Sequence, residues 1–336
     1  MSQLKNSLKR LIPLFILVLV VTFSNALITT AAANPLLLYT SQPDSDAQAL
    51  VKAFTAKYPD IPVNIFRSGT EEVVSKIMAE NQSGKIQADV LLVADVVTFE
   101  ILKRQNLLEA YLSPETKKIG SQFIDPNHMY TGTKIIATVL GVNTKNTKTL
   151  PRSWKALASA AARNQAIMPS PLYSGAAAYN LGVFVRQKSF GWDYYNQLKK
   201  NNITIVQGNG AVLKAISSGE KTYGMIVDYM VARAKQEGSP VELVYPQEGV
   251  TAVTEPIGIV KNTPNLAAAR KFVDFVLSVD GQNLAVSLNY TPVRKDVKAP
   301  AGLKGAAQIK VLTNPVSDLY NSRDEEKKKF SDLFGL

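Results

Sequence analysis

Short apolar runs alternate with amphipathic segments from residue 34 onward. The run LLLYT at 36–40 predicts a buried strand, and Leu50, Phe54 and Tyr58 share one face of a predicted helix over 45–58. The same alternation predicts strands at 63–66 and 89–93 and helices at 71–81 and 96–103. Repeated strand–helix–strand order is typical of a parallel sheet with helices on both faces, so we expect an α/β fold.

A second α/β unit is predicted further along the chain. Its strands are expected at 166–168, 204–206 and 223–227, and its helices at 176–188, 192–201, 211–218 and 229–236. Two longer apolar runs, at 134–142 and 252–260, suit strands that cross between the two units. The chain then continues through predicted helices at 265–278 and 281–288 to a polar end.

The first 33 residues have the layout of a secretory signal peptide. Lys5, Lys9 and Arg10 precede an apolar run at 11–23, and small residues follow it. Cleavage is expected after Ala33, with Ala26 as the alternative. A retained membrane anchor is the other interpretation, but the apolar run is shorter than the roughly 20 residues that a spanning helix needs.

Composition excludes several kinds of chemistry. The 336 residues include no cysteine and one histidine, His128, which excludes disulfides, thiol nucleophiles and sites that need two histidines. Removal of the leader, which holds three basic and no acidic residues, lowers the formal net charge from +11 to +8. The basic residues are scattered, and their one dense run, 327–329, is flanked by acidic residues, so we expect no nucleic-acid partner.

Candidate binding residues follow the predicted strands. Two Ser-Gly pairs, Ser68-Gly69 (followed by Thr70) and Ser174-Gly175, stand just before helices, where free N–H groups and a hydroxyl can bind an anion. Each pair can also be an ordinary helix cap. Ser41 and Asn209 also follow strands, but GxGxxG, GxxxxGK[ST] and GxSxG are absent, so no motif supports a nucleotide or hydrolase site.

Four further polar residues are Asp95, Asp228, Tyr229 and Glu255. Each can be structural, as a helix cap, a core residue or a surface carboxylate. If the two crossing strands form a hinge, all four would line one cleft, where they could hold sugar hydroxyls, an amine or a hard cation. Asp228 and Glu255 could serve as the acid and base of an enzyme, but nothing activates a nucleophile. We therefore expect a binding protein with no catalytic residues.

The sequence resembles the periplasmic solute-binding proteins of ABC importers, and most closely the branch of ferric-ion, hexose-phosphate and aminoethylphosphonate binders. The resemblance rests on the order and spacing of segments over nearly the whole mature chain. These segments are LLYTSQP at 37–43, FRSGTEEVVSKIMAE at 66–80, ADVLLVAD at 88–95, SPLYSGAAAYNLG at 170–182, YPQEGVTAVTEPIGIVKN at 245–262 and AARKFVDFVLSVDGQNLAVSLNYTPVRKDV at 268–297.

The resemblance implies a type II periplasmic binding protein fold, with two doubly wound lobes that close on a ligand about two crossing strands. Lobe one would comprise 34–133 plus 261–336, and lobe two 134–260 with the crossing strands. Carried over by position, one set of residues would hold an anionic group: Ser41, Ser68, Gly69, Thr70, Ser174 and Gly175. The rest of the ligand would face Asn209, Asp228, Tyr229 and Glu255, and Asp95 is a further candidate ligand-binding residue.

The ferric subgroup of this family is marked by adjacent tyrosines after the strand that corresponds to 223–227. This chain has one tyrosine there, Tyr229, and we expect the Tyr194-Tyr195 pair to pack in the interior. A histidine common near the first strand in ferric sites is also replaced by Gln42. A sugar phosphate or phosphonate is thus the expected ligand, without a cofactor, and Fe³⁺ held by Tyr229, Asp228 and Glu255 is the alternative. The resemblance further implies a periplasmic monomer that delivers its ligand to an ABC permease complex in the inner membrane.

Overall fold

The computed structural model describes residues 34–336, which form one compact unit. The predicted signal peptide lies outside the described residues. Within 34–336, no helix is both long and apolar enough to cross a membrane.

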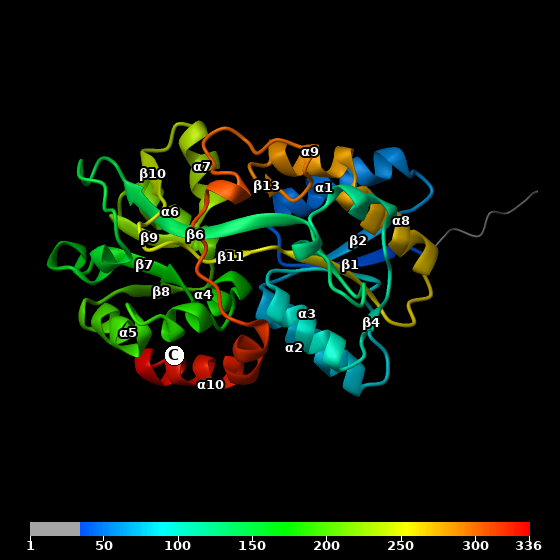
Figure 1. The fold of residues 1–336 in the computed structure, drawn as a ribbon, viewed down its shortest axis with the longest axis horizontal. Helices are drawn as coiled ribbons and strands as arrows, with labels where there is room; N and C mark the ends of the chain where they lie inside the picture. The colour runs from blue at the N-terminus through cyan, green and yellow to red at the C-terminus, as the bar shows by residue number, and fades with distance from the viewer. Residues whose placement is uncertain (1–33) are drawn as a thin grey trace, which may run out of the picture. The chain divides into compact units, whose positions relative to one another are not determined.

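The first lobe is built on a sheet with strand order β2-β1-β3-β12-β4, with β5 paired to β12. Figure 1 labels β1, β2 and β4 of this sheet. Its strands are β1 (Leu36–Thr40), β2 (Val63–Arg67), β3 (Val90–Leu92), β4 (Leu108–Glu109), β5 (Thr131–Gly132) and β12 (Pro256–Val260). Helices α1 (Asp44–Lys57), α8 (Leu266–Leu277) and α9 (Val279–Ser287) cover one face, and α2 (Thr70–Gln82) and α3 (Val96–Arg104) cover the other. Alternate residues of β1 enter the two cores, Leu38 on the α1 side and Tyr39 on the α2 side.

The second lobe has a sheet with strand order β10-β6-β9-β7-β8. Its strands are β6 (Lys134–Asn143), β7 (Ala166–Pro169), β8 (Thr204–Val206), β9 (Tyr223–Val227) and β10 (Val241–Val244), and the short strands β11 (Ala252–Val253) and β13 (Thr291–Pro292) also pair with β6. The helices of this lobe are α4 (Gly175–Arg186), α5 (Gly191–Lys200), α6 (Asn209–Ser218) and α7 (Asp228–Gln236). Across both lobes, residues 34–336 also contain five short 3₁₀ helices in loops, at Pro114–Lys118, Ser121–Phe123, Trp154–Ala158, Ala160–Ala162 and Ala306–Gln308.

The sheets are parallel at their centres and antiparallel where the crossing strands join them. β1 is parallel to β2 and β3, and β7 is parallel to β8 and β9, whereas β12 and β6 run antiparallel to their neighbours β3 and β9. The predicted α/β class with two lobes is confirmed. The predicted crossing strand at 252–260 is divided into β11 and β12, because the backbone turns at Glu255, whose φ is 36°.

The C-terminal part contains a helix where we expected only a polar end. α10 (Val316–Phe334) packs on α4 and α5 of the second lobe and on α3 of the first. Its apolar stripe is narrow and includes Leu319 and Phe330. The ring of Phe330 lies 6.0 Å from that of Tyr195, which is buried together with Tyr194 as predicted. The lobe boundaries remain a prediction. That prediction assigns 261–336 to lobe one, whereas α10 within this range contacts helices of both lobes.

Candidate functional site

A cavity of about 250 Å³ lies between the two lobes. The first lobe contributes residues from the ends of β1, β2 and β3, and the second lobe contributes the starts of α4, α6 and α7. Eight of the predicted site residues line this cavity: Ser41, Gly69, Thr70, Ser174, Gly175, Asn209, Tyr229 and Glu255. These residues lie around one cavity although some of them, such as Ser41 and Glu255, are more than 200 positions apart in the chain.

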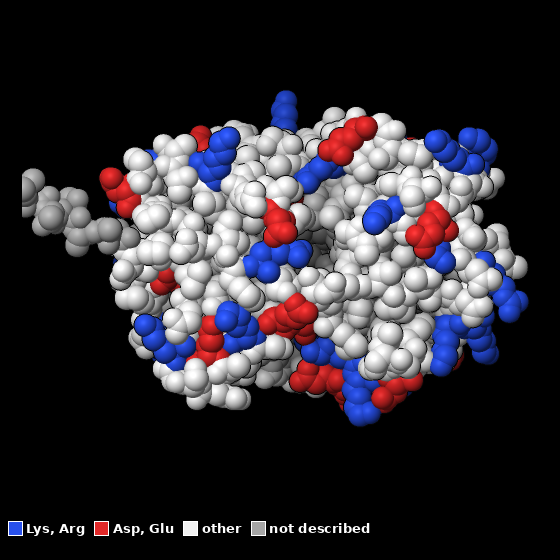
Figure 2. All heavy atoms as spheres, turned by 180° about the vertical axis from the view of Figure 1, so that it is seen from behind, with Lys and Arg blue, Asp and Glu red and all other residues white. Residues whose placement is uncertain are grey.

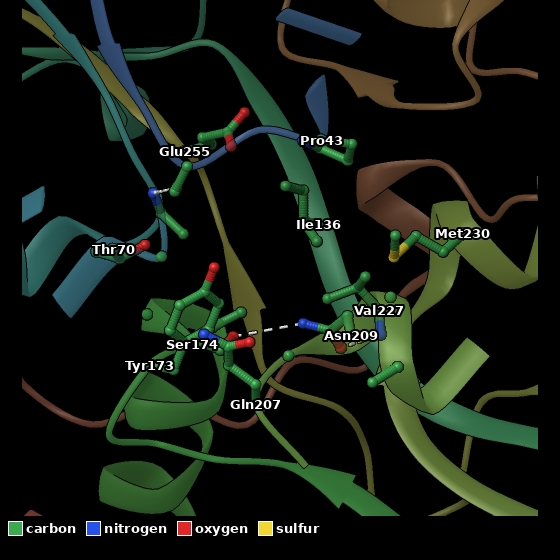
Figure 3. A pocket seen from close by; sticks show the side chains of 18 of the residues that line it. Pro43, Thr70, Ile136, Tyr173, Ser174, Gln207, Asn209, Val227, Met230 and Glu255 are labelled. Atoms are coloured by element: carbon green, nitrogen blue, oxygen red, sulfur yellow. Dashed lines mark hydrogen bonds between the residues drawn. The ribbon is translucent and has the colours of Figure 1, made fainter. Parts of the chain in front are cut away.

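For three of the described helices, the first residue itself lines the cavity. Thr70, Gly175 and Asn209 are the first residues of α2, α4 and α6, so each helix directs its unpaired N–H groups and positive dipole end toward this region. Ser174 Oγ accepts a hydrogen bond from the Ala177 N–H at 3.3 Å and one from Asn209 Nδ2 at 3.4 Å (Figure 3). Ser174 is therefore a helix cap that also lines the cavity.

Arg67 is a cationic lining residue that the sequence analysis did not assign to the site. It is the last residue of β2, and its Nε donates to the Gln42 carbonyl at 2.8 Å while Nη1 lies 3.4 Å from the Tyr173 hydroxyl. Asp44 Oδ1 is 4.0 Å from Nε and belongs to a largely exposed side chain. The position of Arg67 at the end of β2, directly before Ser68-Gly69, is the sequence feature from which its place in the site could have been predicted.

Two residues that were not among the predicted site residues, Gln42 and Lys134, bind the Glu255 carboxylate. Its Oε2 accepts a hydrogen bond from Gln42 Nε2 at 3.2 Å and forms an ion pair with the Nζ of Lys134. The Lys134 and Glu255 side chains are 5% and 4% exposed, so this pair is almost fully removed from solvent. The Glu255 backbone is fixed as well, since its carbonyl accepts from Thr133 Oγ1 at 2.7 Å.

Tyr229 lines the cavity with its ring against that of Tyr290, at a centroid distance of 4.1 Å. The Tyr290 hydroxyl donates to Asp46 Oδ2 at 2.7 Å. Burial raises the pKa of Tyr229 well above its ordinary value, so its phenol is neutral at physiological pH. A second tyrosine therefore does lie beside Tyr229, but it comes from the segment before β13 rather than from the adjacent sequence position.

Three predicted site residues do not line the cavity, because their side chains have other partners. Ser68 Oγ donates to Glu72. Asp95 is fully buried, caps α3 through the Thr98 N–H at 2.9 Å, and pairs with Arg323 of α10 at 2.8 Å.

Asp228, the third of them, points into the second lobe. Its Oδ1 accepts from the N–H groups of Ala137 and Tyr229, and its Oδ2 accepts from the Tyr245 hydroxyl. Burial raises the pKa of Asp228 to about 7.

The lobes touch closely at the edge of the cavity. A Cβ placed on Gly69 would lie 2.6 Å from the Tyr173 ring, and one on Gly175 would lie 2.8 Å from both the Ala94 carbonyl oxygen and Thr70 Oγ1. The Glu71 N–H also donates to the Tyr173 carbonyl at 3.3 Å. The two lobes are thus in direct contact where α2 and α4 begin.

The cavity has polar and apolar sides. Figure 3 shows Thr70 and Ser174 on one side and Ile136 and Met230 on the other. Among the described residues there is no group of three or more His, Cys, Asp and Glu side chains that could hold a metal ion. On the face drawn in Figure 2, basic side chains are scattered among acidic ones, so that face presents no continuous basic patch.

Comparisons with known proteins agree with this architecture. The family model for bacterial extracellular solute-binding proteins matches residues 39–283. A putative 2-aminoethylphosphonate-binding periplasmic protein of Salmonella typhimurium is 27% identical over 265 residues, which cover 74% of each chain.

Two solved structures are similar over most of their length. The periplasmic binding protein AfuA from Actinobacillus pleuropneumoniae, with fructose-6-phosphate bound, has a TM-score of 0.82 at 25% identity, over 90% of this chain and 99% of that one. Iron-bound HitA from Pseudomonas aeruginosa has a TM-score of 0.78 at 24% identity, over 88% and 99%. Because the family model spans most of the chain and the fold is that of type II periplasmic binding proteins, this chain belongs to the family of bacterial extracellular solute-binding proteins.

Proposed function

We propose that the chain is the periplasmic solute-binding component of an ABC importer and captures a small organic phosphate or phosphonate. Membership of the solute-binding family supports the transport role. The proposal includes export by the leader at 1–33, a monomeric state, and delivery of the ligand to a permease complex in the inner membrane.

The observation that carries the choice of ligand is the convergence of α2, α4 and α6 on one cavity beside Arg67. Helix starts supply N–H donors and a positive dipole end, and a guanidinium supplies full charge with planar donors. Hydroxyl groups of Ser41, Thr70 and Ser174 add short-range donors around the same space. A tetrahedral oxyanion satisfies such a set of donors from several directions at once.

Ferric iron is the second candidate, and Tyr229 in the cavity wall is the observation that favours it. Iron would have to displace the proton of a phenol whose pKa is raised by burial. The other proposed ligands are also engaged, since Asp228 binds N–H groups of the second lobe and Glu255 pairs with Lys134. These contacts favour the anion.

The test combines ligand identification with loading. Native mass spectrometry and iron analysis of one purified sample identify what the protein carries. Thermal shifts are then measured with fructose 6-phosphate, inorganic phosphate and ferric citrate, since a bound ligand stabilises by RT ln(1 + [L]/Kd). We expect stabilisation by the organic phosphate and a colourless protein. A visible charge-transfer band that Tyr229→Phe abolishes would replace the proposal with the ferric one.

A further inference from the structure

We infer that Lys134 determines which charges the ligand can carry. Because Lys134 pairs with Glu255, the cavity binds an anion that has no other charged group more tightly than an anion that also carries an ammonium group. This inference rests on the proposed function and narrows it. It concerns Lys134 at the start of β6, a residue that lies behind the cavity wall and is absent from the predicted site.

Glu255 carries the only carboxylate among the described residues that line the cavity. An ammonium group of a ligand would therefore depend on Glu255 as its counter-ion. That charge is already matched, because Lys134 and Gln42 both bind Oε2 in a setting where each charged side chain is about 5% exposed or less. The Lys134 ammonium is also held 4.4 Å from the Tyr290 ring centroid, which fixes it on the Glu255 side.

Four other carboxylates that lie close in sequence to lining residues or beside them are bound elsewhere or largely exposed. Asp46 is bound by Arg233 through both oxygens, and Asp95 is bound by Arg323. Asp228 accepts two N–H groups and a tyrosine hydroxyl. Asp44 is largely exposed and faces Arg67.

The charged groups and helix dipoles that face the cavity together give it a positive electrostatic character. Arg67 and three helix starts face it, while the Glu255–Lys134 pair adds no net charge. A second cation brought to Glu255 would lie close to the Lys134 ammonium with little water between them, which is unfavourable. A hydroxyl group meets no such repulsion and can donate to Oε1, since both described contacts of Glu255 use Oε2.

The test uses two matched pairs of probes that differ in one ammonium group. These are ethylphosphonate against 2-aminoethylphosphonate, and glucose 6-phosphate against glucosamine 6-phosphate, with Kd measured by titration calorimetry at pH 7. For the wild type we expect the member without the ammonium to bind at least about tenfold more tightly in each pair that binds. Lys134→Gln should free the Glu255 carboxylate and shift this ratio toward the ammonium-bearing member by about tenfold or more.

Glu255→Gln provides a second variant if Lys134→Gln does not fold. It leaves the Lys134 charge unpaired, so discrimination against the ammonium should increase. Tighter binding of the ammonium-bearing members by the wild type, or an unchanged ratio in the folded variants, would overturn the inference while leaving the anion proposal intact. If none of the four probes binds at millimolar concentration, the proposed function fails and the inference fails with it.

Discussion

Arg233 of α7 and Asp46 of α1 form a bidentate ion pair that joins the two lobes, with both N–O distances at 2.9 Å. Asp46 is almost fully buried, and the Tyr290 hydroxyl donates to the same carboxylate. The pair joins α1 and α7, and both helices have their N-terminal ends beside the cavity, which Pro43 just before α1 and Tyr229, the second residue of α7, both line. One polar network therefore links the two lobes beside the cavity.

Removal of the Arg233 charge should loosen the lobes. We expect Arg233→Gln to lower the free energy of unfolding by about 3 kcal/mol, because it leaves the buried Asp46 carboxylate without its counter-ion. Small-angle scattering should also give a larger radius of gyration. Lys235→Gln on the same helix is the matched control, since Lys235 pairs with Glu242 inside the second lobe at an exposed position and should change stability by less than about 0.5 kcal/mol. Equal effects of the two changes would argue against an inter-lobe role.

A side chain at Gly69 should hinder closure. The added Cβ of Gly69→Ala meets the Tyr173 ring at 2.6 Å, so the lobes must separate or the ring must move. We expect affinity for an organic phosphate to fall by about tenfold or more, with an unchanged circular dichroism spectrum, because fewer molecules reach the closed form. Gly210→Ala is the control, since Gly210 lines the same cavity and its Cβ would meet no atom within 4 Å. Similar affinities for both variants would show that this contact does not limit closure.

The hydroxyls at the helix starts should contribute to anion binding. Ser174→Ala or Thr70→Ala removes one hydrogen bond to a charged group, on the order of 1.5 to 3 kcal/mol, which corresponds to a roughly tenfold to hundredfold loss of affinity. Ser68→Ala serves as the control, because Ser68 lies in the same loop but donates to Glu72 instead. Calorimetric titration with one organic phosphate compares the three. Normal binding by both cavity variants would leave Ser174 and Thr70 with structural roles alone.

Asp228 should make stability depend on pH. Burial raises its pKa to about 7, against roughly 3.9 in an unfolded chain, so the folded protein binds the extra proton between these values. Its contribution to stability is therefore complete below about pH 4 and is lost as the pH rises through 7, on the order of 4 kcal/mol in total. Asp228→Asn keeps the acceptor for the Ala137 and Tyr229 N–H groups and does not titrate.

Urea unfolding at pH 5 and pH 8 measures this effect. Relative to Asp228→Asn, the wild type should be more stable at pH 5 than at pH 8 by a few kcal/mol. Parallel changes in the two proteins would mean that Asp228 is ionised in the folded state across this range.

Strand ends and helix starts could be predicted from the sequence because both depend on local patterns. LLLYT predicts β1, and the Ser174-Gly175 pair predicts the start of α4, where Ser174 does cap the helix. Side-chain direction could not be predicted in the same way. Asp228 and Tyr229 are neighbours at one helix start, yet one carboxylate turns into the second lobe and the phenol turns to the cavity.

Long-range partners were missed for a related reason. Lys134 and Glu255 pair only because β6 and the turn between β11 and β12 lie side by side, and no short-range pattern encodes that. α10 was missed because its sequence is mostly polar and its few apolar residues gain their packing from α4 and α5. The position of Arg67 at a strand end could be predicted from the sequence. Its contact with Tyr173 could not, because that contact forms only where the two lobes meet.

The position of β12 has a consequence for the order of folding during synthesis. It lies between β3 and β4 in the first sheet, although it follows them in sequence by more than 140 residues. The N-terminal lobe therefore lacks an interior strand until residue 260 has left the ribosome, and closing so long a loop slows formation of the sheet. The late arrival of this interior strand delays completion of the first lobe, and such a delay would be compatible with the export before folding that the proposed leader implies.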